Sequence, residues 1–187
     1  MYKQAIRHYR EAVRLEPERA FYHYQLGDLL RRQGLLDEAM DQFIAAAQLA
    51  PKTAFYRFRV SALYHQVGNP EQAFIHMNIV CAIAPFDDYY QVRLASLAVA
   101  TGRIGDAVSL LQKAIGLRPR NACYQQLLAK AYLLNSRPDL HDALCKRTGE
   151  PDAYDQEFIN RRLAEWGVDV PPKPVREPIP EVFSSLS

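Results

Sequence analysis

The sequence predicts an all-α solenoid in which antiparallel helix pairs stack on one another. The first observation is a period of 34 residues, which is a length typical of helix-pair repeats. Four residue types keep this period in one register: Pro17, Pro51, Pro85 and Pro119; Gly34, Gly68 and Gly102; Ala39, Ala73 and Ala107; Tyr22, Tyr56, Tyr90 and Tyr124. The second observation is that apolar residues between these markers recur at helical spacing, so each helix has an apolar side that neighbours must cover.

The markers divide the chain into successive units. Residues 1–19 contain one helix with the features of a second helix whose partner is missing, which indicates either a natural cap or a fragment of a longer protein. Complete pairs are expected at 20–53, 54–87 and 88–121, and a degenerate pair at 122–150. The expected helices are 2–16, 20–33, 37–50, 54–67, 71–84, 88–101, 105–118, 122–135 and 139–147.

Glycine and proline explain where these helices end. Gly34, Gly68 and Gly102 each follow a first helix, where glycine adopts a left-handed C-cap without steric cost. The four periodic prolines each follow a second helix, which proline cannot continue. First and second helices are therefore told apart by the residue that ends them.

The C-terminal part departs from the period. Residues 151–167 form an amphipathic pattern that carries Trp166, and we expect a helix that caps the array with a polar outer side. Residues 168–187 contain five prolines and are expected to be extended. This tail carries four large apolar residues that either bind a partner or fold back into the protein's own groove: Ile179, Val182, Phe183 and Leu186.

Composition excludes several function classes. The formal net charge is +2, from 23 basic and 21 acidic residues, which does not favour binding to nucleic acid. No apolar run approaches the roughly 18 residues of a membrane span, so direct membrane insertion is not expected. Three cysteines without close pairing favour a reducing compartment. We therefore expect a cytoplasmic protein, with peripheral association with a membrane complex left open.

No residue pattern indicates catalysis. The sequence has no phosphate-binding glycine-rich loop, nucleophile elbow or paired-cysteine zinc spacing. His141 and Cys145 share one helix face, but a zinc site normally needs three or four ligands. Cys81 lies on an apolar stripe and is expected in the core. The sequence therefore predicts a protein that is not an enzyme and has no metal and no cofactor.

The pattern resembles the tetratricopeptide repeat (TPR) family, whose repeats have two antiparallel helices. In residues 20–53 the matching residues are Leu26, Gly27, Gly34, Ala39, Phe43, Ala46 and Pro51. The resemblance implies a right-handed superhelix whose concave side is lined by the first helix of each pair. Small residues are expected where the two helices of a pair approach closely, at Gly27, Ser61, Ala95 and Ala129.

The resemblance also implies which residues line the groove. In the first two complete pairs they are Phe21, Tyr24, Asp28, Arg31, Phe55, Phe58, Arg59, Ala62 and His65. In the following pairs they are Tyr89, Val92, Arg93, Ser96, Val99, Cys123, Gln126, Leu127, Lys130 and Leu133. Aromatic residues and arginines recur in this set, and its charges are four basic against one acidic. Such a groove suits an acidic segment with apolar anchors. The alternatives are that the aromatic side chains pack between neighbouring repeats, and that Arg59 and Arg93 lie on a solvated face or form ion pairs within the chain.

Three functions remain open at this point. The first is a non-enzymatic scaffold or adaptor that binds a segment of a partner protein in the groove, as in the assembly of a larger complex. The second is a structural subunit of a larger, membrane-associated complex, held by its outer faces and its tail. The third is the repeat arm of a longer enzyme.

Overall fold

The computed structural model describes residues 2–146 and 153–166, and these form ten helices and no strand. Their bounds are α1 (Tyr2–Leu15), α2 (Ala20–Arg32), α3 (Leu36–Leu49), α4 (Ala54–Gln66), α5 (Pro70–Ile83), α6 (Asp88–Ala100), α7 (Ile104–Leu117), α8 (Ala122–Leu134), α9 (Pro138–Cys145) and α10 (Ala153–Glu165). The tail residues Ile179, Val182, Phe183 and Leu186 lie outside the described residues.

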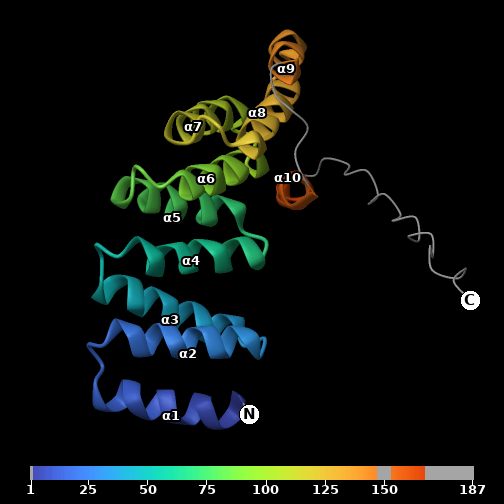
Figure 1. Ribbon diagram of the computed structural model, residues 1–187. Helices are drawn as coiled ribbons and strands as arrows, with labels where there is room; N and C mark the ends of the chain where they lie inside the picture. The colour runs from blue at the N-terminus through green and yellow to red at the C-terminus, as the bar shows by residue number, and fades with distance from the viewer. Residues whose placement is uncertain (1, 147–152, 167–187) are drawn as a thin grey trace, which may run out of the picture.

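Helices α1 to α9 pack in chain order, each against the next, as Figure 1 shows. The most extensive contacts are within the pairs α2 with α3, α4 with α5, and α6 with α7. This arrangement confirms the all-α solenoid of stacked antiparallel helix pairs.

Left-handed residues end the first helices, as the sequence predicts. Gly34, Gly68 and Gly102 have φ angles of 79°, 79° and 74°. In the fourth pair the same position is Ser136, with φ of 56°. In all four pairs the next backbone N–H donates to the carbonyl five residues earlier, at N···O distances of 2.7–3.0 Å, as in a Schellman motif. The fourth pair therefore keeps the geometry without the glycine.

Small residues permit close packing within the pairs. A Cβ atom on Gly27 would lie 2.8 Å from Phe43 Cδ1 and 3.2 Å from the Ala39 carbonyl oxygen. In the next pair Ser61 occupies the same position and donates to the Ala73 carbonyl oxygen at 2.7 Å. The close approach expected at these positions is therefore present.

Tyrosines contact the neighbouring units of the stack. The Tyr22 ring lies 6.4 Å from Tyr9 of α1, and the Tyr90 ring lies 5.4 Å from Phe58 of α4. These partly buried rings therefore pack between successive repeats rather than into solvent.

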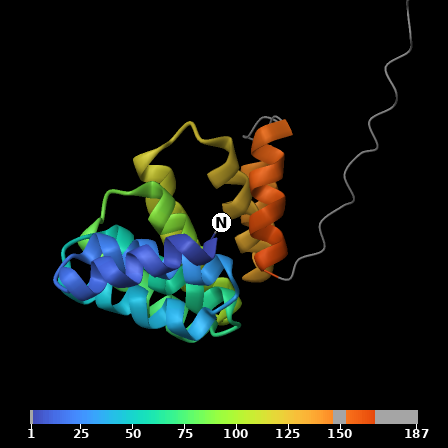
Figure 2. The same cartoon turned by 90° about the horizontal axis from the view of Figure 1, so that it is seen from below.

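Helix α10 does not extend the stack beyond α9. The sequence predicts a cap in this region, and the structure places α10 beside α8 and α6, where it contacts both (Figures 1 and 2). Ile159 and Leu163 of α10 and Trp166 directly after it are buried in one core cluster with residues of α6 and α8. The physical reason is that α6 and α8 present an apolar surface there, which α10 covers with its own apolar side.

Candidate functional site: the inner face of the first helices

The candidate site is the surface formed by the groove residues of α2, α4, α6 and α8, which we call the inner face. It has two parts that differ in what covers them. The open stretch consists of Phe21, Tyr24, Asp28, Arg31, Phe55, Phe58, Arg59, Ala62, His65 and Tyr89. The covered stretch consists of Val92, Arg93, Ser96, Val99, Cys123 and Leu127, which are buried or nearly so.

A row of aromatic side chains follows the open stretch. Phe21, Phe55 and Tyr89 lie one repeat apart and keep 49%, 41% and 42% of their surface exposed. The row is linked across repeats: the Tyr24 ring lies 4.9 Å from the Phe55 ring, edge to face. The Phe58 ring lies 6.1 Å from Tyr89 in the same manner. The rings therefore support one another and still expose apolar surface.

An ion cluster lies beside these rings. The Asp28 carboxylate accepts hydrogen bonds from Arg31 Nη2 at 2.9 Å and from Arg32 Nε at 2.7 Å. It also accepts one from Arg59 Nη2 on the next pair at 2.7 Å. Burial raises the pKa of Asp28, but the hydrogen bonds from Arg31 and Arg32 and the charges of Arg31 and Arg59 together lower the pKa below its ordinary value. Asp28 is therefore ionised and joins two repeats.

A small cavity opens between α2 and α4 at this cluster. Its volume is about 130 Å³, and its lining residues are Arg31, Phe43, Arg59, Ala62, Leu63 and Gln66. The Arg59 guanidinium lies 5.7 Å from the Tyr24 ring centroid, within cation–π range. Its Nε is buried and has no hydrogen-bond partner. Arg31 and Arg59 thus line a small cavity, and both also pair with Asp28 within the chain.

The covered stretch is apolar and lies against α10. Val92, Val99 and Leu127 are at most 9% exposed. They belong to the core cluster that contains Leu163 and Trp166 of the α10 region. The surface that the resemblance assigns to a partner is therefore occupied here by another part of the same chain.

One ion pair accompanies this apolar contact. Arg93 Nη1 donates to both carboxylate oxygens of Glu165, at 3.1 and 3.3 Å. Arg162 Nη1 donates to Glu165 at 2.8 Å. Burial raises the pKa of Glu165 above its ordinary value, and the positive charge of Arg93 offsets this only in part. Arg93 thus receives its carboxylate from α10.

The sequence also predicts His65, Lys130 and Leu133 in the groove. His65 lies close enough to Glu165 to influence its charge. Lys130 is partly buried on α8, and Leu133 keeps 42% of its surface exposed near the end of that helix. Lys130 and Leu133 belong to neither of the two stretches.

The sequence analysis does not predict that α10 covers part of the inner face. A comparison of equivalent positions in successive repeats does indicate it. The position of Asp28 becomes Ala62 in the second complete pair and Ser96 in the third. The position of Arg31 becomes His65 and then Val99. This loss of charge along the array indicates that the later part of the inner face is buried.

Potential metal ligands and the thiols were the groups to test for chemistry in the described parts of the chain. Within residues 2–146 and 153–166, no three potential metal-ligating side chains come together. Cys145 Sγ lies 3.5 Å from His141 Nε2, as their shared face predicts. Burial raises the pKa of Cys81 to about 12, so its thiol is a core group and not a nucleophile at neutral pH. None of the ten described helices has the length and apolar character needed to cross a membrane.

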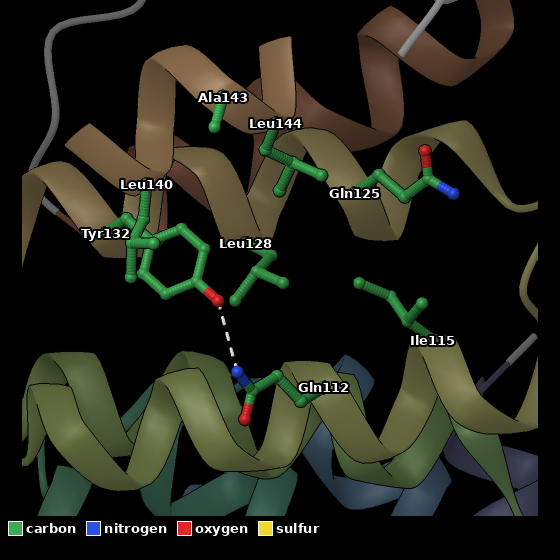
Figure 3. Close-up of a pocket in the computed structure, with 8 residues that line it drawn as sticks. All are labelled: Gln112, Ile115, Gln125, Leu128, Tyr132, Leu140, Ala143 and Leu144. Atoms are coloured by element: carbon green, nitrogen blue, oxygen red, sulfur yellow. Dashed lines mark hydrogen bonds between the residues drawn. The ribbon is translucent and has the colours of Figure 1, made fainter. Parts of the chain in front are cut away.

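A second concavity lies on the other side of α8. Figure 3 shows this pocket of about 390 Å³ between α7 and the pair α8–α9. Its lining residues are Gln112, Ile115, Gln125, Leu128, Tyr132, Leu140, Ala143 and Leu144. Gln112 Nε2 donates to the Tyr132 hydroxyl at 3.1 Å across one end. The pocket lies beside α9, which has 8 residues against 14 in the second helices α3, α5 and α7.

Comparison with known proteins identifies the repeats. A family model described as tetratricopeptide repeat matches residues 2–54 and 92–140. No protein with a curated description matches the sequence.

Solved structures share the fold at low sequence identity. A crystal structure of MamA protein is similar with a TM-score of 0.69 and 16% identity, over 91% of this chain and 89% of MamA. MamA 41-end from Desulfovibrio magneticus RS-1 has a TM-score of 0.67 and 21% identity, over 78% and 82% of the two chains. YrrB, described as a TPR protein with an unusual peptide-binding site, has a TM-score of 0.67 and 14% identity, over 78% and 75%.

Proposed function

Because this chain belongs to the tetratricopeptide repeat family, whose members are commonly non-enzymatic scaffolds for protein–protein interaction, we propose that it binds a segment of a partner protein on the open stretch of its inner face. In this role the chain is an adaptor that recruits its partner to a larger assembly. The peptide-binding site of YrrB, a protein of the same fold, supports this role by analogy.

The observation that carries the proposal is the exposed aromatic row. Phe21, Phe55 and Tyr89 repeat at one register position and remain more than 40% exposed. Large aromatic side chains at the centre of an interface contribute strongly to binding, because they bury much apolar area with few rotatable bonds. Since the row spans three repeats, it fits an extended or helical segment with apolar anchors rather than a single small molecule.

The ion cluster adds a preference for acidic groups. Arg31, Arg32 and Arg59 surround the single carboxylate of Asp28, so three positive charges meet one negative charge and two remain uncompensated. An acidic residue of the partner beside the aromatic row would pair with them, and arginine favours bidentate contact with carboxylates. Asp28 limits this preference because it already engages all three guanidinium groups.

A second candidate is a structural subunit held through its outer face. On α5, Ile75 and Ile79 are 49% and 38% exposed. The equivalent residues are Asp41 and Ala45 in the preceding repeat, and Ser109 and Lys113 in the following one. The middle repeat therefore exposes apolar surface where its neighbours are mostly polar or small, and this favours an outer contact.

Photo-crosslinking distinguishes the two candidates. We would place a photoreactive phenylalanine analogue at Phe55 on the inner face and, in a matched variant, at Ile79 on the outer face. After irradiation in native cell extract, crosslinked proteins are identified by mass spectrometry. We expect a discrete adduct from position 55 that Phe21→Ala weakens. An adduct from position 79 alone would refute binding on the open stretch and favour the structural subunit.

A further inference from the structure

We propose that α10 is an exchangeable occupant of the covered stretch, and that this stretch is a binding site for an amphipathic helix of a partner protein. The partner helix would have the same pattern as α10: an apolar stripe and an acidic residue in its last turn. This inference rests on the proposed function, since it concerns a second part of the same inner face.

The contacts of α10 define the chemistry of that site. Ile159 and Leu163 lie four residues apart on one side of α10, and Trp166 follows three residues later, directly after the helix ends. They are 3%, 4% and 8% exposed. They pack in one cluster with residues of α6 and α8. The covered stretch is therefore shaped to receive an apolar helix face.

The carboxylate of Glu165 fills a position that the stack leaves without an acid. Arg59 and Arg93 are equivalent residues of adjacent repeats. Arg59 pairs with Asp28 of the preceding first helix at 2.7 Å. The residue equivalent to Asp28 in front of Arg93 is Ala62, which has no charge. Arg93, whose side chain is 11% exposed, is instead paired by Glu165. An acidic residue is therefore a specificity determinant of whatever helix lies there.

The docking of α10 leaves polar atoms unpaired. Arg93 Nε, Arg162 Nε and Trp166 Nε1 are buried without a hydrogen-bond partner. Buried donors without acceptors oppose the apolar contribution of the contact. A partner helix that supplies acceptors to Arg93 and lacks the Arg162 and Trp166 donors would bind the same surface with fewer such groups. The occupied site is thus open to competition.

The topology allows this exchange without dismantling the solenoid. Helices α1 to α9 contact one another in chain order, and α10 lies beside α6 and α8 rather than between them. Its release would free Arg93 and the apolar surface of α6 and α8 against which α10 packs, in continuation of the aromatic row at Tyr89. The bound partner would then span both stretches of the inner face.

A peptide-exchange experiment with the full chain tests the inference. The probe is a fluorescein-labelled synthetic peptide with the sequence of residues 153–167 of this chain, and its binding is followed by fluorescence anisotropy. Leu163→Asp, which places a charge in the apolar contact, is expected to release α10 and to increase probe affinity at least tenfold over wild type. Ser109→Asp, an exposed change on α7, is the matched control and should bind the probe like wild type.

A charge exchange tests the role of Arg93. A probe carrying Glu165→Arg should bind the Leu163→Asp chain at least tenfold more weakly than the unchanged probe. Adding Arg93→Glu to that chain should restore the binding of the altered probe. Equal affinity of the two probes would overturn the specificity assigned to Arg93, and equal binding of the unchanged probe to wild type and Leu163→Asp would overturn exchange.

Hydrogen–deuterium exchange of the wild-type chain provides a measurement that does not depend on the folding of Leu163→Asp. Unlabelled probe in excess should accelerate exchange of residues 156–166, because it displaces α10. Unchanged protection at saturating probe would overturn the inference. This outcome is separate from the crosslinking at Phe55: a crosslinked partner together with unchanged α10 protection would retain the proposed function and remove only the exchange.

Discussion

Arg59 and Arg93 occupy the same position in adjacent repeats, yet each obtains its carboxylate from a different source. Arg59 pairs with Asp28 of the neighbouring first helix. Arg93 pairs with Glu165, which is 72 residues away in the sequence. Hydrogen bonds from arginines lower the pKa of Asp28 despite its burial, whereas burial raises the pKa of Glu165. The open stretch is thus completed by the stack itself, and the covered stretch by a separate helix.

The largest expected loss of stability comes from a change in the packing beneath the open stretch. Gly27→Ala places a Cβ atom 2.8 Å from Phe43 Cδ1 and 3.2 Å from a backbone oxygen, and Phe43 is only 1% exposed. Overpacking of this kind costs typically about 1–3 kcal/mol, and we expect the upper end because the helices of the pair must separate. Urea unfolding measures the loss.

Gly116→Ala in α7 is the matched control for that prediction. No heavy atom lies within 4 Å of the added Cβ atom. Gly116 is the residue before the last of α7, and alanine in a helix is more favourable than glycine by at most about 0.5–1 kcal/mol, so this change should stabilise the protein slightly. If both alanine substitutions changed the free energy of unfolding equally, close packing at Gly27 would not be the cause of the loss.

The next largest loss of stability is expected when either of the two equivalent arginines is replaced. Arg93→Met leaves Glu165 half-buried with Arg162 as its remaining hydrogen-bonded partner, and we expect a loss of about 2 kcal/mol in the free energy of unfolding. Arg59→Met leaves Asp28 with Arg31 and Arg32, and a loss of about 1 kcal/mol is expected. Chemical denaturation of both variants measures the difference.

A double-mutant cycle sharpens this comparison. Because Arg93→Met and Glu165→Leu remove the two sides of one ion pair, their losses should be less than additive in the double variant. Arg162 also donates to Glu165, so part of the loss remains. Additive losses would show that the ion pair does not couple α10 to α6.

A smaller, stabilising effect on the free energy of unfolding is expected at Ser136, directly after α8. Ser136 holds the left-handed position that glycine holds in the three preceding pairs, with φ of 56°. A side chain in this region is strained, so Ser136→Gly should raise the free energy of unfolding by about 0.5–1 kcal/mol. Thermal unfolding measures the gain. Ser109→Gly, in a right-handed helical position of α7, should instead destabilise the protein.

The smallest expected effect is a pH dependence of stability that His76, in the middle of the stack, produces. Burial and the positive charge of Arg57 lower the pKa of His76 from 6.5, and its ring stacks on Tyr64 at 5.3 Å. Between this lowered pKa and 6.5 the unfolded chain binds more protons than the folded chain, so stability should fall as the pH falls through this window. Urea unfolding at pH 7.5 and 5.5 measures the change. His76→Gln should reduce it, and an unaltered pH dependence would assign the effect to other groups.

Much of the fold was predictable because its determinants are local. Glycines with positive φ end α2, α4 and α6, and these positions could be read from the period of 34 residues. Predicted and observed helix ends mostly agree within one residue. The exposed aromatic row was also predictable, since Phe21, Phe55 and Tyr89 repeat in register. The pairing of Arg59 with Asp28 was not, because it depends on how two helices of different repeats face each other.

The sequence by itself determined the helices, their pairing and the order of the stack, because caps, helical spacing and small contact residues act between neighbours in the chain. Only the tertiary structure decided where α10 lies and which residues of the inner face it covers. The pattern of Ile159, Leu163 and Trp166 requires an apolar surface without specifying which one. That choice depends on the surface that α6 and α8 form together in the stack. It also depends on Arg93, which finds its acidic partner only on α10.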